Sequence, residues 1–206
     1  MAMLGEFKLS SKAEAQAPLS PETALQRLMD GNRRFAEARM TSFDEDLEML
    51  KAKTVANQQP FAAVLSCADS RVPVELIFDQ SIGRLFVTRV AGNIASSPMI
   101  ASLEYAVAVL GTKAIMVLGH TNCGAVKATI EGKAVPGQIS TLFPYIRPAA
   151  DQGGSDLEAA IKANAKIQAR LLRQSSPVLA EQVKLNRLTI AAAYYDLASG
   201  KATLLD

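Results

Sequence analysis

Short, largely apolar segments alternate along this chain with segments of helical periodicity. The apolar segments are 61–66, 85–90, 114–118 and 188–194. A short apolar run of this kind is typical of a strand that is buried on both faces of a parallel sheet. Strands that alternate with helices indicate a parallel sheet with helices packed on both sides. We therefore expect an α/β fold with a mainly parallel central β-sheet flanked by helices, and a final short strand at 202–205.

The helices begin and end at recognisable residues. Ser20 as N-cap and Pro21 at the first helical position predict an N-terminal helical arm, interrupted near Gly31. The other predicted helices are 44–56, 97–110 closed by Gly111, one beginning near Gly124, and a long one capped by Asp156. The apolar side of the last helix is predicted to carry Leu157, Ile161, Ile167, Leu171 and Leu172.

Length and composition fit one domain. The chain has 206 residues, of which 49% are hydrophobic, enough to bury a sizeable core. We expect this domain to span 20–206, after a mobile N-terminal segment at 1–19. Within that segment, 6–9 resembles the remnant of a cloning linker, and 15–17 has the A-x-A form of a signal-cleavage site. A cytoplasmic location is the default expectation, and a periplasmic or lumenal one is the alternative if a native export signal has been removed.

The charge and hydropathy patterns argue against two classes of partner. The formal net charge is only +2, and no basic cluster is interleaved with aromatic residues, so we expect no nucleic-acid partner. We also expect no membrane partner, because the sequence lacks an apolar run of about 18 residues.

Both cysteines and the only histidine lie where predicted strands end. Cys67 follows the first strand, and His120 and Cys123 follow the third. Sites in parallel sheets gather at the carboxyl ends of the strands. Two thiolates and one imidazole make a typical three-ligand zinc set, whose fourth position is either open, as in catalytic sites, or closed by a carboxylate such as Asp69.

Two other interpretations of these residues need weighing. Cysteine and histidine are also ordinary core residues, and two cysteines can form a disulfide in an oxidising compartment. A disulfide would leave His120 and the nearby Asp-Ser-Arg cluster without a role. The coincidence of all three residues at strand ends favours the metal site.

The motifs around these residues resemble a known family. Cys67-Ala-Asp-Ser-Arg71 followed by His120-Thr-Asn-Cys-Gly124 is similar to the signature pair of the β-class carbonic anhydrases. Segments 29–33, 86–93 and 103–106 also resemble that family, and the resemblance extends from about Pro21 to Asp206.

The resemblance implies a role for each matching residue. Zinc would be held by Cys67, His120 and Cys123, and Asp69 and Arg71 would form the catalytic dyad. The substrate-binding residues of the plant-like subgroup, in which the zinc site is open, match Gln58, Phe86 and Tyr105. In that subgroup these residues line a cleft shared by two subunits, so the resemblance implies a homodimer, or a dimer of dimers.

The implied reaction is the reversible hydration of carbon dioxide to bicarbonate and a proton, by a zinc-bound hydroxide that Asp69 and Arg71 orient. The chain departs from the family at Val90, where many members have Asn, and at Val109, where some plant-like members have His. It also lacks the tryptophan, at the position of Val64, that marks the subgroup whose zinc is closed by Asp. Hydrolysis of carbonyl sulfide or carbon disulfide, and a non-catalytic zinc protein, remain the alternative functions.

Overall fold

A five-stranded sheet forms the centre of the molecule. The computed structural model describes residues 19–41, 48 and 54–205. Its strands are β1 (Ala62–Ser66), β2 (Leu85–Arg89), β3 (Ala114–His120), β4 (Thr189–Tyr195) and β5 (Ala202–Leu205). They are ordered β2-β1-β3-β4-β5. The first four are parallel, and β5 pairs antiparallel with β4. The predicted α/β class and all five predicted strands are confirmed.

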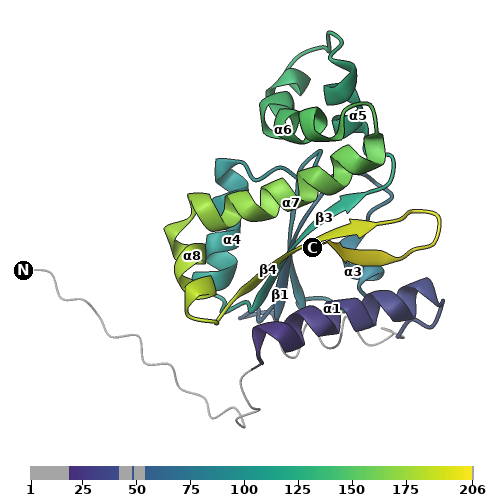
Figure 1. Ribbon diagram of the computed structural model, residues 1–206. Coiled ribbons are helices and arrows are strands. Elements are labelled where there is room, and N and C mark those ends of the chain that lie inside the picture. The colour runs from purple at the N-terminus through teal and green to yellow at the C-terminus, as the bar shows by residue number, and fades with distance from the viewer. Residues whose placement is uncertain (1–18, 42–47, 49–53, 206) are drawn as a thin grey trace, which may run out of the picture.

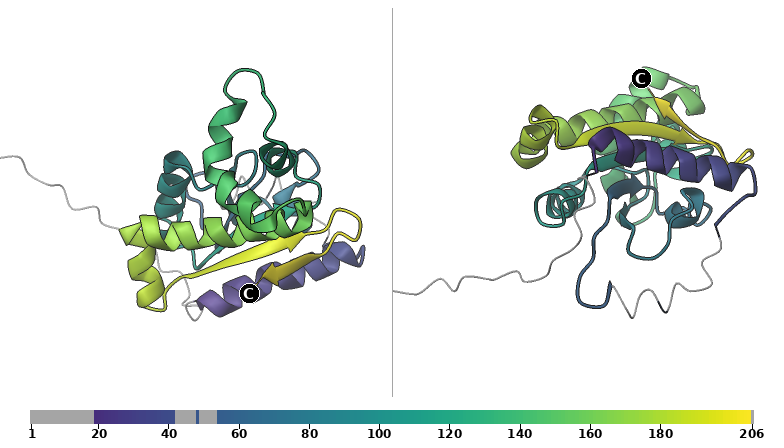
Figure 2. Two further views of the ribbon diagram at one scale, coloured as in Figure 1. Left: turned by 45° about the horizontal axis from the view of Figure 1, so that its top comes forward. Right: turned by 90° about the horizontal axis from the view of Figure 1, so that it is seen from below.

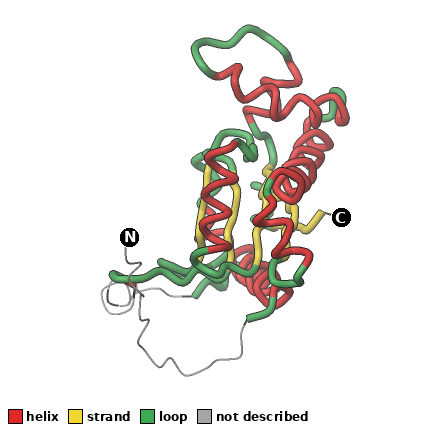
Figure 3. The backbone as a smooth tube through the Cα atoms, turned by 90° about the vertical axis from the view of Figure 1, so that its left-hand side faces the viewer, coloured by secondary structure: helices red, strands yellow, loops and turns green. Residues whose placement is uncertain are grey.

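Helices cover both faces of this sheet. They are α1 (Pro21–Ala36), α3 (Val74–Ile77), α4 (Ser97–Ala108), α5 (Gly124–Glu131), α6 (Phe143–Gly153), α7 (Leu157–Ser175) and α8 (Pro177–Lys184), with a 3-10 turn at Ile139–Leu142. Figures 1 and 2 show α1 and α7 on opposite sides of the β4–β5 hairpin. Helices α5 and α6 project beyond the ends of the strands, as the tube view also shows (Figure 3). No helix within the described ranges is both long and apolar enough to cross a membrane.

The core has one apolar layer on each side of the sheet. Alternate residues of a strand point to opposite faces, so Val64 of β1 packs on the side of α1 and α3, with Leu28 and Ile77. Its neighbour Leu65 packs on the side of α4, α7 and α8, with Leu172 among others. Burial on both faces explains why β1 and β3, which are buried at every position, are almost wholly apolar.

Helix α1 differs from its prediction in one respect. It begins at Pro21 with the Ser20 side chain accepting a hydrogen bond from the Thr23 amide, as predicted, but it continues through Gly31 without interruption. A Cβ atom at Gly31 would lie 1.8 Å from the carbonyl oxygen of Phe78. The glycine therefore permits close packing of the helix and does not break it.

The other helix predictions are partly confirmed. Asp156 caps α7 through the Ala159 amide, α5 begins at Gly124, and the helix predicted at 97–110 ends at Ala108. The helix predicted at 44–56 falls mostly outside the described residues, as does the N-terminal segment before residue 19. On α7, Ile161 and Leu172 are buried as predicted.

Candidate metal centre

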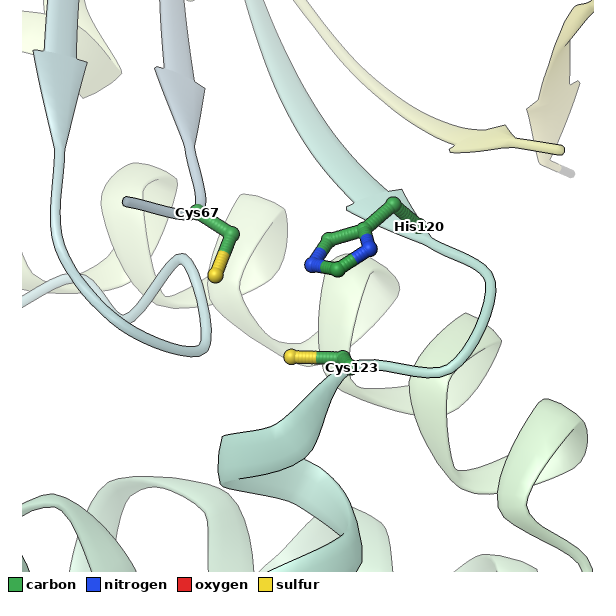
Figure 4. A group of neighbouring side chains, drawn as sticks. All are labelled: Cys67, His120 and Cys123. Carbon is green, nitrogen blue, oxygen red and sulfur yellow. The ribbon is translucent and has the colours of Figure 1, made fainter. Parts of the chain in front are cut away.

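Three side chains converge at the carboxyl ends of β1 and β3. Cys67 directly follows β1, His120 is the last residue of β3, and Cys123 is the N-cap of α5. Strands β1 and β3 are parallel neighbours, with Ser66 beside Leu118. The ligand atoms of the three residues lie within 4.8 Å of one another, and Figure 4 shows their side chains pointing toward a common point.

The orientation of His120 fits a metal ligand. Its side chain is fully buried, and Nδ1 lies 3.0 Å from the Thr121 carbonyl oxygen. A carbonyl oxygen only accepts, so Nδ1 carries the proton and Nε2 presents its lone pair. Within the described part of the chain, Nε2 has no hydrogen-bond partner. Burying a nitrogen without a hydrogen-bond partner costs free energy, unless a ligand binds to that nitrogen.

The two cysteines are free and buried, and their sulfurs lie within 4.8 Å of each other. The contact with Cys123 lowers the pKa of Cys67 against the opposing effect of burial, and the hydrogen bond from the Gly92 amide lowers it further. The same contact, together with burial, raises the pKa of Cys123. Two sulfurs and one imidazole nitrogen form a donor set that fits Zn²⁺, and metal binding would displace the remaining thiol proton.

Asp69 and Arg71 form an ion pair at the edge of this group. Nε and Nη2 of Arg71 donate to the two carboxylate oxygens at 2.9 and 2.7 Å, and the Arg71 backbone amide adds a third bond at 2.9 Å. These bonds from Arg71 hold the pKa of the Asp69 carboxyl well below its usual range. Asp69 Oδ2 lies 3.8 Å from His120 Nε2, so the carboxylate is adjacent to the three candidate ligands.

Backbone contacts fix the loop that carries Cys67. The Arg89 side chain, at the end of β2, donates to the carbonyl oxygens of Cys67 at 3.0 Å and of Asp69 at 2.6 Å. The Gly92 amide donates to the Cys67 sulfur at 3.3 Å. Gly92 has φ +76°, and a Cβ atom there would lie 2.7 Å from the Ile146 side chain. Only glycine brings the backbone to this position without strain.

A second group of hydrogen bonds holds the turn after His120. The Thr121 hydroxyl lies 3.1 Å from the Tyr194 hydroxyl and 3.1 Å from an Asp196 carboxylate oxygen. The Thr121 amide donates to the Tyr195 carbonyl at 3.0 Å. These bonds position the Thr121 carbonyl, which in turn orients the His120 ring.

The three remaining predicted site residues lie apart from this group. Phe86 and Tyr105 contact each other, with ring centroids 6.3 Å apart. Phe86 is near the start of β2, and Tyr105 on α4 is 48% exposed. Gln58 is exposed and precedes β1, at the opposite end of that strand from Cys67. The fold of one chain therefore brings the three candidate ligands close to Asp69 and Arg71. It does not bring Gln58 to the same place.

Several residues in the surroundings of the site were not predicted. Arg89 and Gly92 lie in the segment 86–93 that resembles the family, which is the signal that could have indicated them. Asn164 and Gln168, which are fully buried on α7, are polar residues spaced four apart within an apolar helix face. That spacing was an available signal as well.

Comparison with known proteins agrees with this geometry. The family model described as carbonic anhydrase matches residues 62–202. Carbonic anhydrase 2 of Mycobacterium tuberculosis is 33% identical over 195 residues, which cover 91% of this chain and 94% of that protein. The β-carbonic anhydrase of Coccomyxa, solved in complex with acetazolamide, is 27% identical with a TM-score of 0.67, over 92% of this chain and 87% of the other.

A third comparison concerns the fold. One of the tetrameric β-carbonic anhydrases of Sordaria macrospora superposes with a TM-score of 0.72 at 20% identity, over 88% of this chain and 96% of the other. The family model, the curated relative and the shared fold all match the part of the chain that carries the Cys-His-Cys group. The chain therefore belongs to the carbonic anhydrase family, and within it to the β class.

Proposed function

We propose that this chain hydrates carbon dioxide reversibly to bicarbonate and a proton, with zinc held by Cys67, His120 and Cys123. The observation that carries the proposal is the unpartnered Nε2 of His120, which lies in a group of three ligand atoms within 4.8 Å. Zinc bound there would act as a Lewis acid that lowers the pKa of a water molecule from about 15.7 toward 7. The two sulfurs donate charge and make this effect weaker than at an all-histidine site.

Asp69 would orient the attacking water. Its carboxylate lies beside the ligand group and remains ionised because of the bonds from Arg71. An ionised carboxylate accepts a hydrogen bond, and so can aim the lone pair of a water oxygen at the carbon of CO2. Arg71 would act as a positioning residue, since it holds both carboxylate oxygens.

The same ion pair supports assigning this chain to the plant-like subgroup, in which the zinc site is open. Three hydrogen bonds from Arg71 hold the Asp69 carboxylate. For Asp69 to become a fourth metal ligand, its carboxylate would have to give up some of these hydrogen bonds to Arg71. We therefore place Asp69 on Arg71 in the active protein, which leaves the fourth zinc position for water.

We further propose a homodimer, or a dimer of dimers, that completes the substrate cleft. Gln58 lies at the end of β1 opposite Cys67, so a second copy is needed to bring it to the site. The exposed Tyr105 packs on Phe86 of β2, which is an edge strand of the sheet, and offers an apolar surface for that contact. A related fold is tetrameric in Sordaria macrospora. Light scattering would show a monomer if this proposal is wrong.

The decisive experiment is stopped-flow CO2 hydration by purified protein of measured zinc content. We expect about one zinc per chain and hydration well above the uncatalysed rate. Cys67→Ala should lose zinc and activity together, because its removal leaves two ligands. Full zinc content in that variant would contradict the ligand set. Zinc without hydration would identify a non-catalytic metal protein, and sulfide release from carbon disulfide would identify a hydrolase instead.

A further inference from the structure

Two buried amide side chains of α7 lie behind the metal centre. Asn164 and Gln168 are each 0% exposed and are one helical turn apart. Burying a polar side chain is costly unless its hydrogen bonds are made. Both residues are surrounded by the apolar face of α7, where alanine or leucine would pack without that cost. The hydrogen bonds that these two side chains make account for their presence there.

The amides hold the loop that follows β2 at two points. Asn164 Nδ2 donates to the Gly92 carbonyl at 2.8 Å, and Gln168 Oε1 accepts from the Ala95 amide at 2.9 Å. Gln168 Nε2 donates to Asn164 Oδ1 at 3.0 Å and to the Tyr145 carbonyl at 2.9 Å. The two side chains thus form one connected network, in which each donor and acceptor has a defined direction.

This network ends on a metal ligand. Gly92, whose carbonyl is held by Asn164, donates its own amide to the Cys67 sulfur at 3.3 Å. A hydrogen bond to a thiolate draws electron density from the sulfur and limits the charge that the sulfur donates to a metal. A metal that receives less charge is the stronger Lewis acid. The position of one backbone amide therefore affects the chemistry of the centre.

We propose that Asn164 and Gln168 are positioning residues of the metal centre, which hold the Gly92 amide on the Cys67 sulfur. The inference rests on the proposed zinc site. In this proposal, α7 affects the Lewis acidity of the metal through the loop at 92–95. The side-chain amides of Asn164 and Gln168 do not contact the substrate.

Near-isosteric variants that lack the hydrogen bonds test this role. Asn164→Leu and Gln168→Met remove the amide groups and keep approximate side-chain volume. We expect zinc affinity, measured by competition with a chelator, to fall by about 10- to 100-fold. In the cobalt-substituted protein, the sulfur-to-cobalt charge-transfer band should shift in both variants, and the midpoint of the pH–rate profile should rise.

A matched control separates tuning from loss of stability. Leu172→Ala creates a cavity on the same helix, at a fully buried residue whose apolar side chain makes none of the hydrogen bonds of the network. It should lower the melting temperature but leave the cobalt band and metal affinity unchanged. An equal shift in Leu172→Ala, or an unchanged band and affinity in folded Asn164→Leu and Gln168→Met, would overturn the proposal.

A measurement on the unmodified protein covers the case in which the variants do not fold. After substitution with ¹¹³Cd, a proton NMR spectrum should show scalar coupling between the metal and the Gly92 amide proton, transmitted through the Cys67 sulfur. Slow hydrogen exchange of that amide should accompany it. Absence of the coupling would overturn the proposal. Metal affinity, the cobalt band and the cadmium coupling do not depend on CO2 hydration, so a protein that binds metal but is inactive would refute the proposed function alone.

Discussion

Asp69 is the residue whose charge matters most to the proposed chemistry. Asp69→Asn keeps the shape of the side chain but removes the negative charge that accepts a hydrogen bond and holds Arg71. We expect this variant to keep zinc and to lose most of the CO2 hydration rate, by about 100-fold or more. Zinc content and stopped-flow hydration on the same sample provide the measurement.

The control for this variant is a carboxylate in an ordinary surface ion pair. Asp30 pairs with Arg33 on the exposed side of α1, at 2.9 Å. Asp30→Asn should leave both zinc content and rate unchanged. A normal rate in Asp69→Asn would reduce the Asp69–Arg71 pair to a structural contact of the loop.

Thr121 provides a second prediction at the scale of single residues. Thr121→Val keeps the β-branched shape but loses the hydroxyl contacts with Tyr194 and Asp196. The carbonyl that orients His120 would then be held less firmly, and zinc affinity should fall by about tenfold. Thr121→Ser retains the hydroxyl and should restore the affinity. Equal affinities for the valine and serine variants in a chelator competition would contradict this role.

The three candidate ligands could be located from the sequence, whereas most of the contacts that position them could not. The chain has one histidine and two cysteines, so their placement at strand ends was informative. Threonine, asparagine and glutamine are common on surfaces and in turns, and nothing local distinguishes Thr121. The spacing of Asn164 and Gln168 on α7 indicates a buried polar pair but does not show what the pair contacts. Their roles depend on contacts with residues about 70 positions away, which only the folded chain reveals.

At the scale of elements, polar contacts as well as apolar ones hold α1 against α3 and the turn between β4 and β5. Asn32 donates to the carbonyl oxygens of Ile77 at 3.2 Å and Gly200 at 2.9 Å. Near the end of the helix, Arg34 donates to the buried carboxylate of Asp79, which also accepts from Thr41. Asp79 thus connects the end of α1 to the segment after α3.

This contact predicts a pH-dependent loss of stability. Burial alone would raise the pKa of Asp79, but the bonds from Arg34 and Thr41 outweigh it and lower the folded-state pKa. The stabilisation is therefore present above the unfolded pKa of about 3.9 and is lost as pH falls through the folded value. Asp79→Asn should destabilise the protein by about 2 kcal/mol at neutral pH.

Chemical denaturation at several pH values measures this contribution. The difference between the unmodified protein and Asp79→Asn should shrink below about pH 4, as the carboxylate becomes protonated. The exposed Asp30→Asn should change stability by less than about 0.5 kcal/mol at any pH. A difference that is constant from neutral to acidic pH would show that Asp79 acts without its charge.

Strands were easier to predict than helices for a physical reason. A strand buried on both faces must be apolar at every position, so its sequence shows its location directly. Helix α6 was not predicted, and its sequence carries Pro148 in the helix interior, where a proline normally ends or kinks a helix. Gly31 was read as an interruption because its purpose, the close approach of Phe78, is a tertiary contact.

At the scale of the whole molecule, the order of the strands accounts for the position of the centre. Parallel β1 and β3 end side by side, which brings Cys67 near His120 and Cys123 although they are far apart in sequence. The motif spacing could predict this arrangement because sites of parallel sheets gather at carboxyl ends. The position of Gln58 in the proposed dimer cannot be predicted in this way, since it would depend on a surface contributed by a second chain.

The pH dependence of catalysis is set by the whole metal centre and, in the proposed oligomer, by whether its subunits act together. If Asp69 closed the zinc site at neutral pH, opening would require a rearrangement, and subunits that opened together would give a steep, cooperative pH–rate profile. Here three hydrogen bonds from Arg71 already hold the Asp69 carboxylate. We therefore expect CO2 hydration to rise with pH in one step, with a Hill slope of about one, as for titration of a single group.

Two results would contradict this expectation. The first is a Hill slope of about two in the pH–rate profile. The second is a crystal structure of the zinc-loaded protein at near-neutral pH in which an Asp69 oxygen lies at about 2.0–2.2 Å from the metal. Arg71→Ala provides an internal comparison, because it removes the side chain that holds the carboxylate. If Arg71 keeps the site open, this variant alone should bring Asp69 onto the metal and lose hydration near neutral pH while it retains zinc.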